Sequence, residues 1–188
     1  MKRVLVAIVL AGCGGRSPAP SAPVRTEVDK AETAEKARKH DEARKHYQAA
    51  IANAKDPASI AFARREFAET LISWGEYPEA IVQLEGAVAA KGDDASVWHD
   101  LGLLYHNSGD DHRAIDALEK SRTLAPADPR PRVSLGVLRW KRGDLAGART
   151  EYRGLLELEL PDRLREKAEW AIRELTKLLA ARDASTSP

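Results

Sequence analysis

Histidines are the first side chains of this sequence to consider for metal or acid–base chemistry. The chain has five of them, and none stands in an HExxH motif or in a pair four residues apart. His99 and His106 are seven residues apart, which on a helix separates them by about 10 Å along the axis. Two side chains that far apart on one helix cannot bind the same metal ion unless another segment of the chain supplies further ligands. We therefore expect no metal site.

Paired carboxylates are the second candidates. Asp93 and Asp94, and likewise Asp110 and Asp111, stand where turns are expected. General acid–base catalysis needs a pocket that shifts a pKa, which an exposed turn does not provide. The sequence also contains no GxSxG, P-loop or dinucleotide-binding motif. We therefore predict no catalytic residues, no small-molecule substrate and a protein that is not an enzyme.

The only cysteine, Cys13, has a context that gives its thiol a specific chemistry. Two basic residues precede the apolar run Val4–Leu10, which is far shorter than the ~20 residues that span a bilayer. The residues Leu-Ala-Gly-Cys that end at Cys13 resemble the lipobox of bacterial lipoproteins. The resemblance implies that residues 1–12 are a signal peptide and that Cys13 is the lipid attachment site, carrying a covalent diacylglycerol and a fatty acid. An ordinary secretory leader with an incidental cysteine is the alternative.

Residues 13–26 are rich in Pro, Ser, Ala and Gly and are expected to form a flexible, lipid-anchored linker. In lipoproteins of the enteric type, an aspartate after the lipid-bearing cysteine retains the protein in the inner membrane. Gly14 stands there instead, so the resemblance implies the bacterial cell envelope, on the periplasmic face of the outer membrane. The membrane would be contacted through the lipid anchor, and no other cofactor is expected.

The charge balance argues against nucleic acid as a partner. Lys plus Arg number 30 and Asp plus Glu number 29, so the formal net charge is +1. Binding to nucleic acid needs clustered basic surface. Charged residues make up 31% of the chain and hydrophobic residues 43%, a mixture that suits amphipathic helices around a modest core.

The sequence repeats itself with a period of 34 residues, as the spacing of Gly75, Gly109 and Gly143 shows. Within each copy, apolar residues recur three and four positions apart, which indicates two amphipathic helices joined by a turn at the glycine. Small residues at two fixed positions would let the paired helices approach closely, and stacked pairs would share one core. These small residues are Ala68, Gly102 and Gly136 at one position, and Ala80, Ala114 and Ala148 at the other.

The copy at residues 95–128 resembles the tetratricopeptide repeat. The matching residues are Trp98, Leu101, Gly102, Tyr105, Ala114, Leu118 and Pro126. The resemblance implies an all-α fold, a tetratricopeptide-repeat helical solenoid of three to four helix pairs over residues 27–161. Its first copy is degenerate and fits Ala31, Ala43, Tyr47 and Ala50. An amphipathic stretch at 162–182 is expected to form a C-terminal capping helix, followed by a polar tail at 183–188.

In this family, the first helices of successive repeats line a concave groove that holds a protein partner. The positions concerned imply a partner-binding set of His99, Leu103, His106, Asn107, Arg130, Val133, Val137, Trp140 and Lys141. Trp is enriched at binding hot spots, which favours Trp140 as the centre. The alternative is that Trp140 packs on a neighbouring helix or on the capping helix.

Leader, lipid-bearing cysteine and repeat array together are similar in plan to the lipoprotein pilotins of type IV pili. The expected function is therefore an outer-membrane-tethered scaffold that binds a protein partner for assembly or localisation of an envelope complex of the pilus or secretion type. An adaptor that regulates cell-wall enzymes is the alternative. An envelope enzyme would need a cleft and a nucleophile or metal that the sequence does not show.

Overall fold

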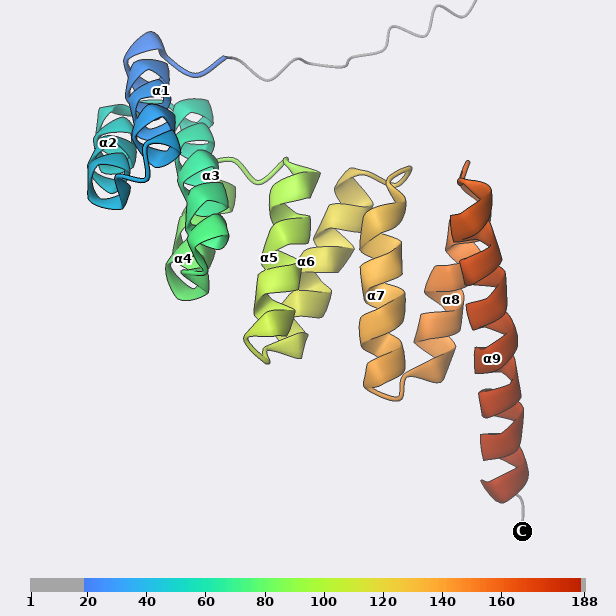
Figure 1. Ribbon diagram of the computed structural model, residues 1–188. Helices are drawn as coiled ribbons and strands as arrows, with labels where there is room; N and C mark the ends of the chain where they lie inside the picture. The colour runs from blue at the N-terminus through green and yellow to red at the C-terminus, as the bar shows by residue number, and fades with distance from the viewer. Residues whose placement is uncertain (1–18, 187–188) are drawn as a thin grey trace, which may run out of the picture.

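The computed structural model describes residues 19–186, and over that range the chain forms nine α-helices and no strand. Consecutive helices form antiparallel pairs that stack side by side, and the last helix packs on the fourth pair (Figure 1). The predicted all-α solenoid of helix pairs with a capping helix is therefore confirmed. The helices are α1 (Ala22–Lys36), α2 (His40–Asn53), α3 (Pro57–Trp74), α4 (Tyr77–Ala90), α5 (Ala95–Asn107), α6 (Asp111–Leu124), α7 (Pro129–Lys141), α8 (Leu145–Leu156) and α9 (Asp162–Thr186).

Both ends of the array differ from the predicted boundaries. Helix α1 begins at Ala22, inside the segment expected to be linker, because Pro23 suits the first helical turn and Val24 is completely buried. Helix α9 continues to Thr186, through most of the expected polar tail, since no glycine or proline interrupts it. The expected signal peptide, Cys13 and linker residues 14–18 lie outside the described residues.

The turns within the pairs form as the repeat predicts. Gly75, Gly109 and Gly143 have φ of +79°, +85° and +79° and follow α3, α5 and α7; glycine adopts this left-handed conformation without steric cost. Asp110 then accepts a hydrogen bond from the Arg113 backbone N–H at 3.1 Å and so caps α6. The glycine ends one helix and the acid begins the next.

Close packing inside each pair depends on the small residues of the repeat. A Cβ atom added to Gly102 would lie 2.6 Å from Leu118 Cγ and 3.2 Å from the Ala114 carbonyl oxygen. One added to Gly136 would lie 2.9 Å from Tyr152 Cε2. Neither distance leaves room for a larger side chain, so the helices of each pair are in direct contact at these positions.

The degenerate first copy is also a packed helix pair, α1–α2. Its four matching residues, Ala31, Ala43, Tyr47 and Ala50, are all buried. The Tyr47 ring stacks on Phe67 of α3 with 5.1 Å between centroids. The first pair is therefore continuous with the core of the second.

A buried ion network joins the third and fourth pairs. The Glu151 side chain on α8 is only 1% exposed. Its carboxylate accepts a hydrogen bond from Arg122 of α6 and lies 3.4 Å and 3.6 Å from the guanidinium nitrogens of Arg132 and Arg139 on α7. Three cations from two helices thus converge on one carboxylate.

None of the helices described is both long and apolar enough to cross a membrane.

Replacing Gly102 with leucine is expected to destabilise the array by about 1–3 kcal/mol, because the new side chain must displace Leu118 or push α6 away. Thermal unfolding followed by circular dichroism should show a midpoint several degrees lower. Ala181→Leu, at an exposed position of α9, is the matched control. An unchanged midpoint for Gly102→Leu would show that α5 and α6 are not packed in this way.

Replacing Glu151 with glutamine is expected to cost about 3 kcal/mol, since it removes the buried carboxylate that Arg122 and Arg132 face and leaves Arg139 only its pair with Glu119. Urea unfolding measures the loss. Glu157→Gln removes the same charge at an exposed position near the end of α8 and should change stability by less than about 0.5 kcal/mol. Equal effects of the two substitutions would refute the network.

Candidate partner-binding surface

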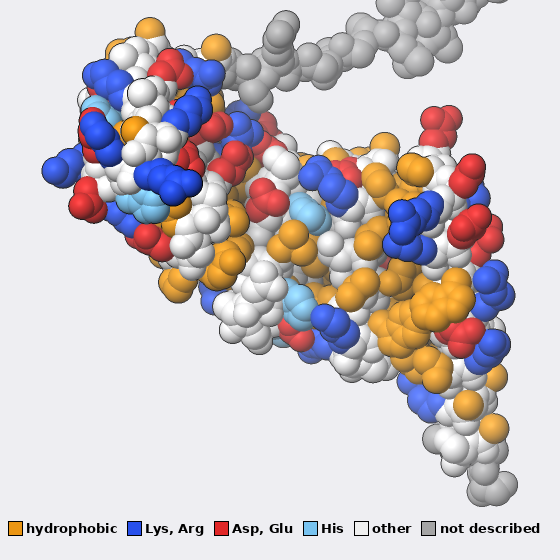
Figure 2. All heavy atoms as spheres, in the orientation of Figure 1, with side chains coloured by type: hydrophobic (Ala, Val, Ile, Leu, Met, Phe, Trp, Pro, Cys, Tyr) orange, Lys and Arg blue, Asp and Glu red, His pale blue; other side chains and the backbone are white. Residues whose placement is uncertain are grey.

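The odd-numbered helices α3, α5, α7 and α9 lie on one side of the array, and we call this side the odd-helix face. In Figure 1 these helices lie in front of the even-numbered helices α6 and α8. Figure 2, in the same orientation, shows hydrophobic side chains gathered over α7 and α9. This face carries the residues that the sequence predicted for partner binding.

An exposed apolar patch lies at the α7–α9 end of the odd-helix face. It consists of Val137, Trp140 and Trp170, and Val137 and Trp170 are 40% and 54% exposed. The Trp140 and Trp170 rings lie 5.9 Å apart between centroids. Leu103 on α5 is another exposed large apolar side chain. Contiguous exposed apolar surface of this kind marks sites of interaction.

Trp140 combines the two roles that the sequence left open. Its ring packs edge-on against Tyr152 of α8, with 6.5 Å between centroids, and is half-buried against the core beneath α8 and α9. Its other neighbour, Trp170, belongs to the capping helix. Trp140 is therefore a core-edge residue that supports the more exposed Trp170.

Trp170 was missed by the sequence analysis, which followed the apolar stripe that α9 buries. It lies off that stripe, next to the exposed Glu169. An aromatic residue on an otherwise polar helix face was the available signal, because such a side chain has no place in the core. Leu178 of α9 is a further exposed apolar side chain, at 44%.

Not all of the predicted residues can meet a partner. His99 is only 7% exposed, and its Nε2 lies 3.2 Å from Ser134 Oγ on α7. Its ring therefore joins two odd-numbered helices and is not available to a ligand. Val133 is likewise partly buried, against the core beneath α8 and α9.

Four polar members of the predicted set remain at the surface. Asn107 and Lys141 are exposed. His106 lies beside Lys141, with 3.5 Å between Nε2 and Nζ, while its Nδ1 lies 2.7 Å from Asp111 Oδ1. Arg130 is exposed and pairs with Asp128 at 2.7 Å. Lys141 follows Trp140 of the apolar patch in the sequence, and all four groups could hydrogen-bond a segment lying along this face.

The α3–α5 end of the odd-helix face is acidic. Arg65 is paired there with Glu66, Glu69 and Asp94, at 2.6 Å, 3.5 Å and 3.6 Å. Partial burial, followed by the charge of Glu66, raises the pKa of Glu69 above its usual range despite the nearby arginine. Negative charge is therefore in excess at this end.

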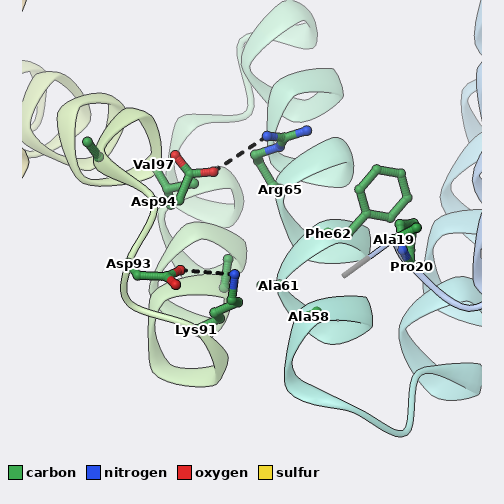
Figure 3. A pocket seen from close by; sticks show the side chains of 12 residues that line it. Ala19, Pro20, Ala58, Ala61, Phe62, Arg65, Lys91, Asp93, Asp94 and Val97 are labelled. Atoms are coloured by element: carbon green, nitrogen blue, oxygen red, sulfur yellow. Dashed lines mark ion pairs between the residues drawn. The ribbon is translucent and has the colours of Figure 1, made fainter. Parts of the chain in front are cut away.

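A cleft of about 510 Å³ opens between α3 and the turn that precedes α5 (Figure 3). Phe62 and Arg65 line its α3 side, and Arg65 points toward Asp94 across it. Ala19 and Pro20, where the described chain begins, lie beside Phe62. The cleft offers ion pairing and apolar contact, and no Ser, Thr, Cys or His is among the residues that line it.

Among residues 19–186, no group of three or more His, Cys, Asp or Glu side chains could hold a metal ion.

Comparison with known proteins agrees with this architecture. Residues 95–128 match the model of the tetratricopeptide repeat family. A tetratricopeptide-repeat-containing protein of Pseudomonas aeruginosa is 37% identical over 113 residues, which cover 59% of this chain and 45% of that relative. The chain therefore spans less than half the length of that curated relative.

Two solved structures share the fold at low sequence identity. A crystal structure of the MamA protein is 17% identical, with a TM-score of 0.68 over 86% of this chain and 85% of that one. The structure of YrrB, described as a tetratricopeptide-repeat protein with an unusual peptide-binding site, is 17% identical, with a TM-score of 0.66 over 85% of this chain and 79% of that one. Residues 95–128 are thus a tetratricopeptide repeat, and the chain has the tetratricopeptide-repeat helical fold.

Proposed function

We propose that this protein is an outer-membrane-tethered scaffold whose odd-helix face holds a protein partner for assembly or localisation of an envelope complex. The observation that carries the binding role is the apolar patch. Trp170 is 54% exposed beside Trp140, and burying such a pair gains a large contact area at little cost in side-chain entropy.

The geometry favours a chain segment as the bound element. The odd-helix face extends across successive helices, and it carries the exposed polar residues Asn107, Arg130 and Lys141 as well as the apolar patch. The tetratricopeptide-repeat protein YrrB, which has a similar fold, is described as having a peptide-binding site. A segment that crosses α5, α7 and α9 would contact Leu103, Val137 and Trp170 in turn.

The tether rests on the sequence around Cys13. A charged start, a short apolar run and a lipobox-like Leu-Ala-Gly-Cys precede a segment rich in proline and serine. Two acyl chains on one cysteine would anchor the protein stably, where a single chain would hold it only marginally. A pilus or secretion complex is the proposed context, and an adaptor for cell-wall enzymes would use the same surface with a different partner.

The lipid anchor is tested by labelling growing cells with an alkyne fatty-acid analogue. The wild-type protein should take up label and fractionate with the outer membrane. Cys13→Ser should take up none and should retain residues 1–12 or leave the membrane, because the acylated thiol is absent. A wild-type protein that carries no label would rule out the lipoprotein proposal while leaving the binding surface untouched.

The binding surface is tested by capture of partners from detergent-solubilised envelope. Trp170→Ala should weaken capture about thirty-fold, corresponding to a loss of about 2 kcal/mol at a hot spot, with the melting temperature unchanged. Trp140→Ala should weaken capture and also lower the melting temperature, because its ring packs on Tyr152.

The control is Lys120→Ala, an exposed position on α6, away from the odd-helix face. Arg122, on the same helix, is not a suitable control, because it pairs with the buried Glu151 and its loss would lower stability. Capture that survives Trp170→Ala would move the binding site elsewhere. The identity of the captured partner distinguishes a pilus or secretion complex from a cell-wall enzyme.

A further inference from the structure

The two ends of the odd-helix face differ in chemistry, and together they specify a partner. We infer that the face accepts an extended protein segment in which an apolar anchor is separated by about six residues from a cluster of Lys or Arg. The anchor would lie on the apolar patch of α7–α9, and the basic cluster would lie over an acidic belt on α1, α3 and α5. This inference rests on the proposed partner-binding role of the same face.

The acidic belt is a set of carboxylates brought together from three helices. Its members are Glu32, Glu35, Glu66, Glu69, Asp94 and Asp100. Four of them, the glutamates, line one hollow of about 220 Å³ together with Tyr47 and Thr70, and no cation is among the residues that line it. The Thr70 hydroxyl donates to Glu35 Oε2 at 3.1 Å, which holds that carboxylate in place.

Charge within the acidic belt is only partly balanced. Arg65 contacts Glu66, Glu69 and Asp94. Lys36 lies 3.9 Å from the Glu32 carboxylate, so two cations face the six carboxylates of the belt. The raised pKa of Glu69 arises from burial and then from the neighbouring carboxylates Glu66, Asp100 and Asp94, with Arg65 opposing them. A bound Lys or Arg side chain would relieve this repulsion, whereas an acidic segment would add to it.

The apolar patch supplies the other half of the recognition. Val137 and Trp170 are exposed and Trp140 supports them, so a leucine or phenylalanine of the partner would be desolvated against two indole rings. Lys141 is exposed and follows Trp140 at the end of α7. Because Lys141 is a cation, it directs the basic cluster of a partner away from the patch and toward the belt.

Spacing between the two halves follows from the helix packing. Glu69 lies on α3 and Trp140 on α7, two odd-numbered helices along the array. Packed helices are spaced about 10 Å apart, as α5 and α7 are, and α3 is not packed along α5, so the two ends are separated by at least about 20 Å. An extended chain rises about 3.3 Å per residue, and about six residues are the shortest spacer that bridges that distance.

The test uses fluorescein-labelled peptides and the folded protein. One peptide carries Lys-Arg-Lys and Leu-Phe-Leu separated by six neutral residues, and a second has the same elements in reverse order. A third replaces the basic cluster with Glu-Asp-Glu, and a fourth scrambles the first. Fluorescence anisotropy at 50 mM and 300 mM salt gives the affinities.

At least one of the two basic peptides should bind ten-fold or more tightly than the acidic and scrambled peptides, and high salt should weaken it. Glu69→Lys should reduce that affinity about ten-fold, and Trp170→Ala about thirty-fold. Asp116→Lys makes the same change of charge at an exposed position of α6 and should leave the affinity unchanged. Melting temperatures within 2 °C of wild type establish that each variant is folded.

Equal or tighter binding of the acidic peptide overturns the inference, as does binding of neither basic peptide or an affinity that Glu69→Lys does not reduce. Such a result leaves the proposed function standing if Trp170→Ala still abolishes capture of the native partner. If capture also survives Trp170→Ala, the binding surface itself is refuted.

Discussion

The close approach of the two helices within each pair is the constraint on which the rest of this structure depends. At Gly102 the helix α5 backbone lies so near Leu118 that an added Cβ would be 2.6 Å from its Cγ. Because each odd-numbered helix packs on its even-numbered partner through such a small residue, its opposite side is left uncovered by the pair. On α3, α5 and α7 the odd-helix face is the sum of those uncovered sides, which the 34-residue period places in a row, and α9 extends it by packing on α8. The binding surface is therefore a consequence of the packing rule.

A second interaction is needed to align one helix pair with the next. Between the third pair, α5–α6, and the fourth pair, α7–α8, the ion network around Glu151 supplies it. Its carboxylate is buried, so removing it from water is costly unless several donors compensate. Arg122, Arg132 and Arg139 do so from α6 and α7. Ion pairs depend on distance and direction more sharply than apolar contacts do, so the network specifies how one pair sits on the next. It also places these arginines in a structural role, although their residue type alone would suggest a surface for anionic ligands.

The fold could be predicted from the sequence because the repeat marks both the small contact residues and the glycine turns. The first and last residues of the array could not be predicted as well, because helix boundaries depend on burial. Val24 is buried by the array, so α1 begins at Ala22, earlier than predicted. Periodicity also shows which side of a helix faces a neighbour without showing which neighbour. His99 was thus assigned to the binding surface although Ser134 of α7 covers it. Trp170 was overlooked because the capping helix has no following repeat to compare with.

The position of the proposed lipid anchor gives the binding surface an orientation relative to the membrane. Helix α1 begins nine residues after Cys13 (22 − 13 = 9), and nine residues reach at most about 30 Å. If Cys13 bears lipid, as proposed, the start of α1 stays within that distance of the membrane, and the acidic belt lies at the same end of the solenoid. The apolar patch on α7 and α9 lies at the other end of the solenoid (Figure 1), so nothing in the tether holds it near the lipid. A partner bound as inferred would then have its basic cluster at the membrane-proximal end and its apolar anchor at the distal end, which orients the partner as well as holding it.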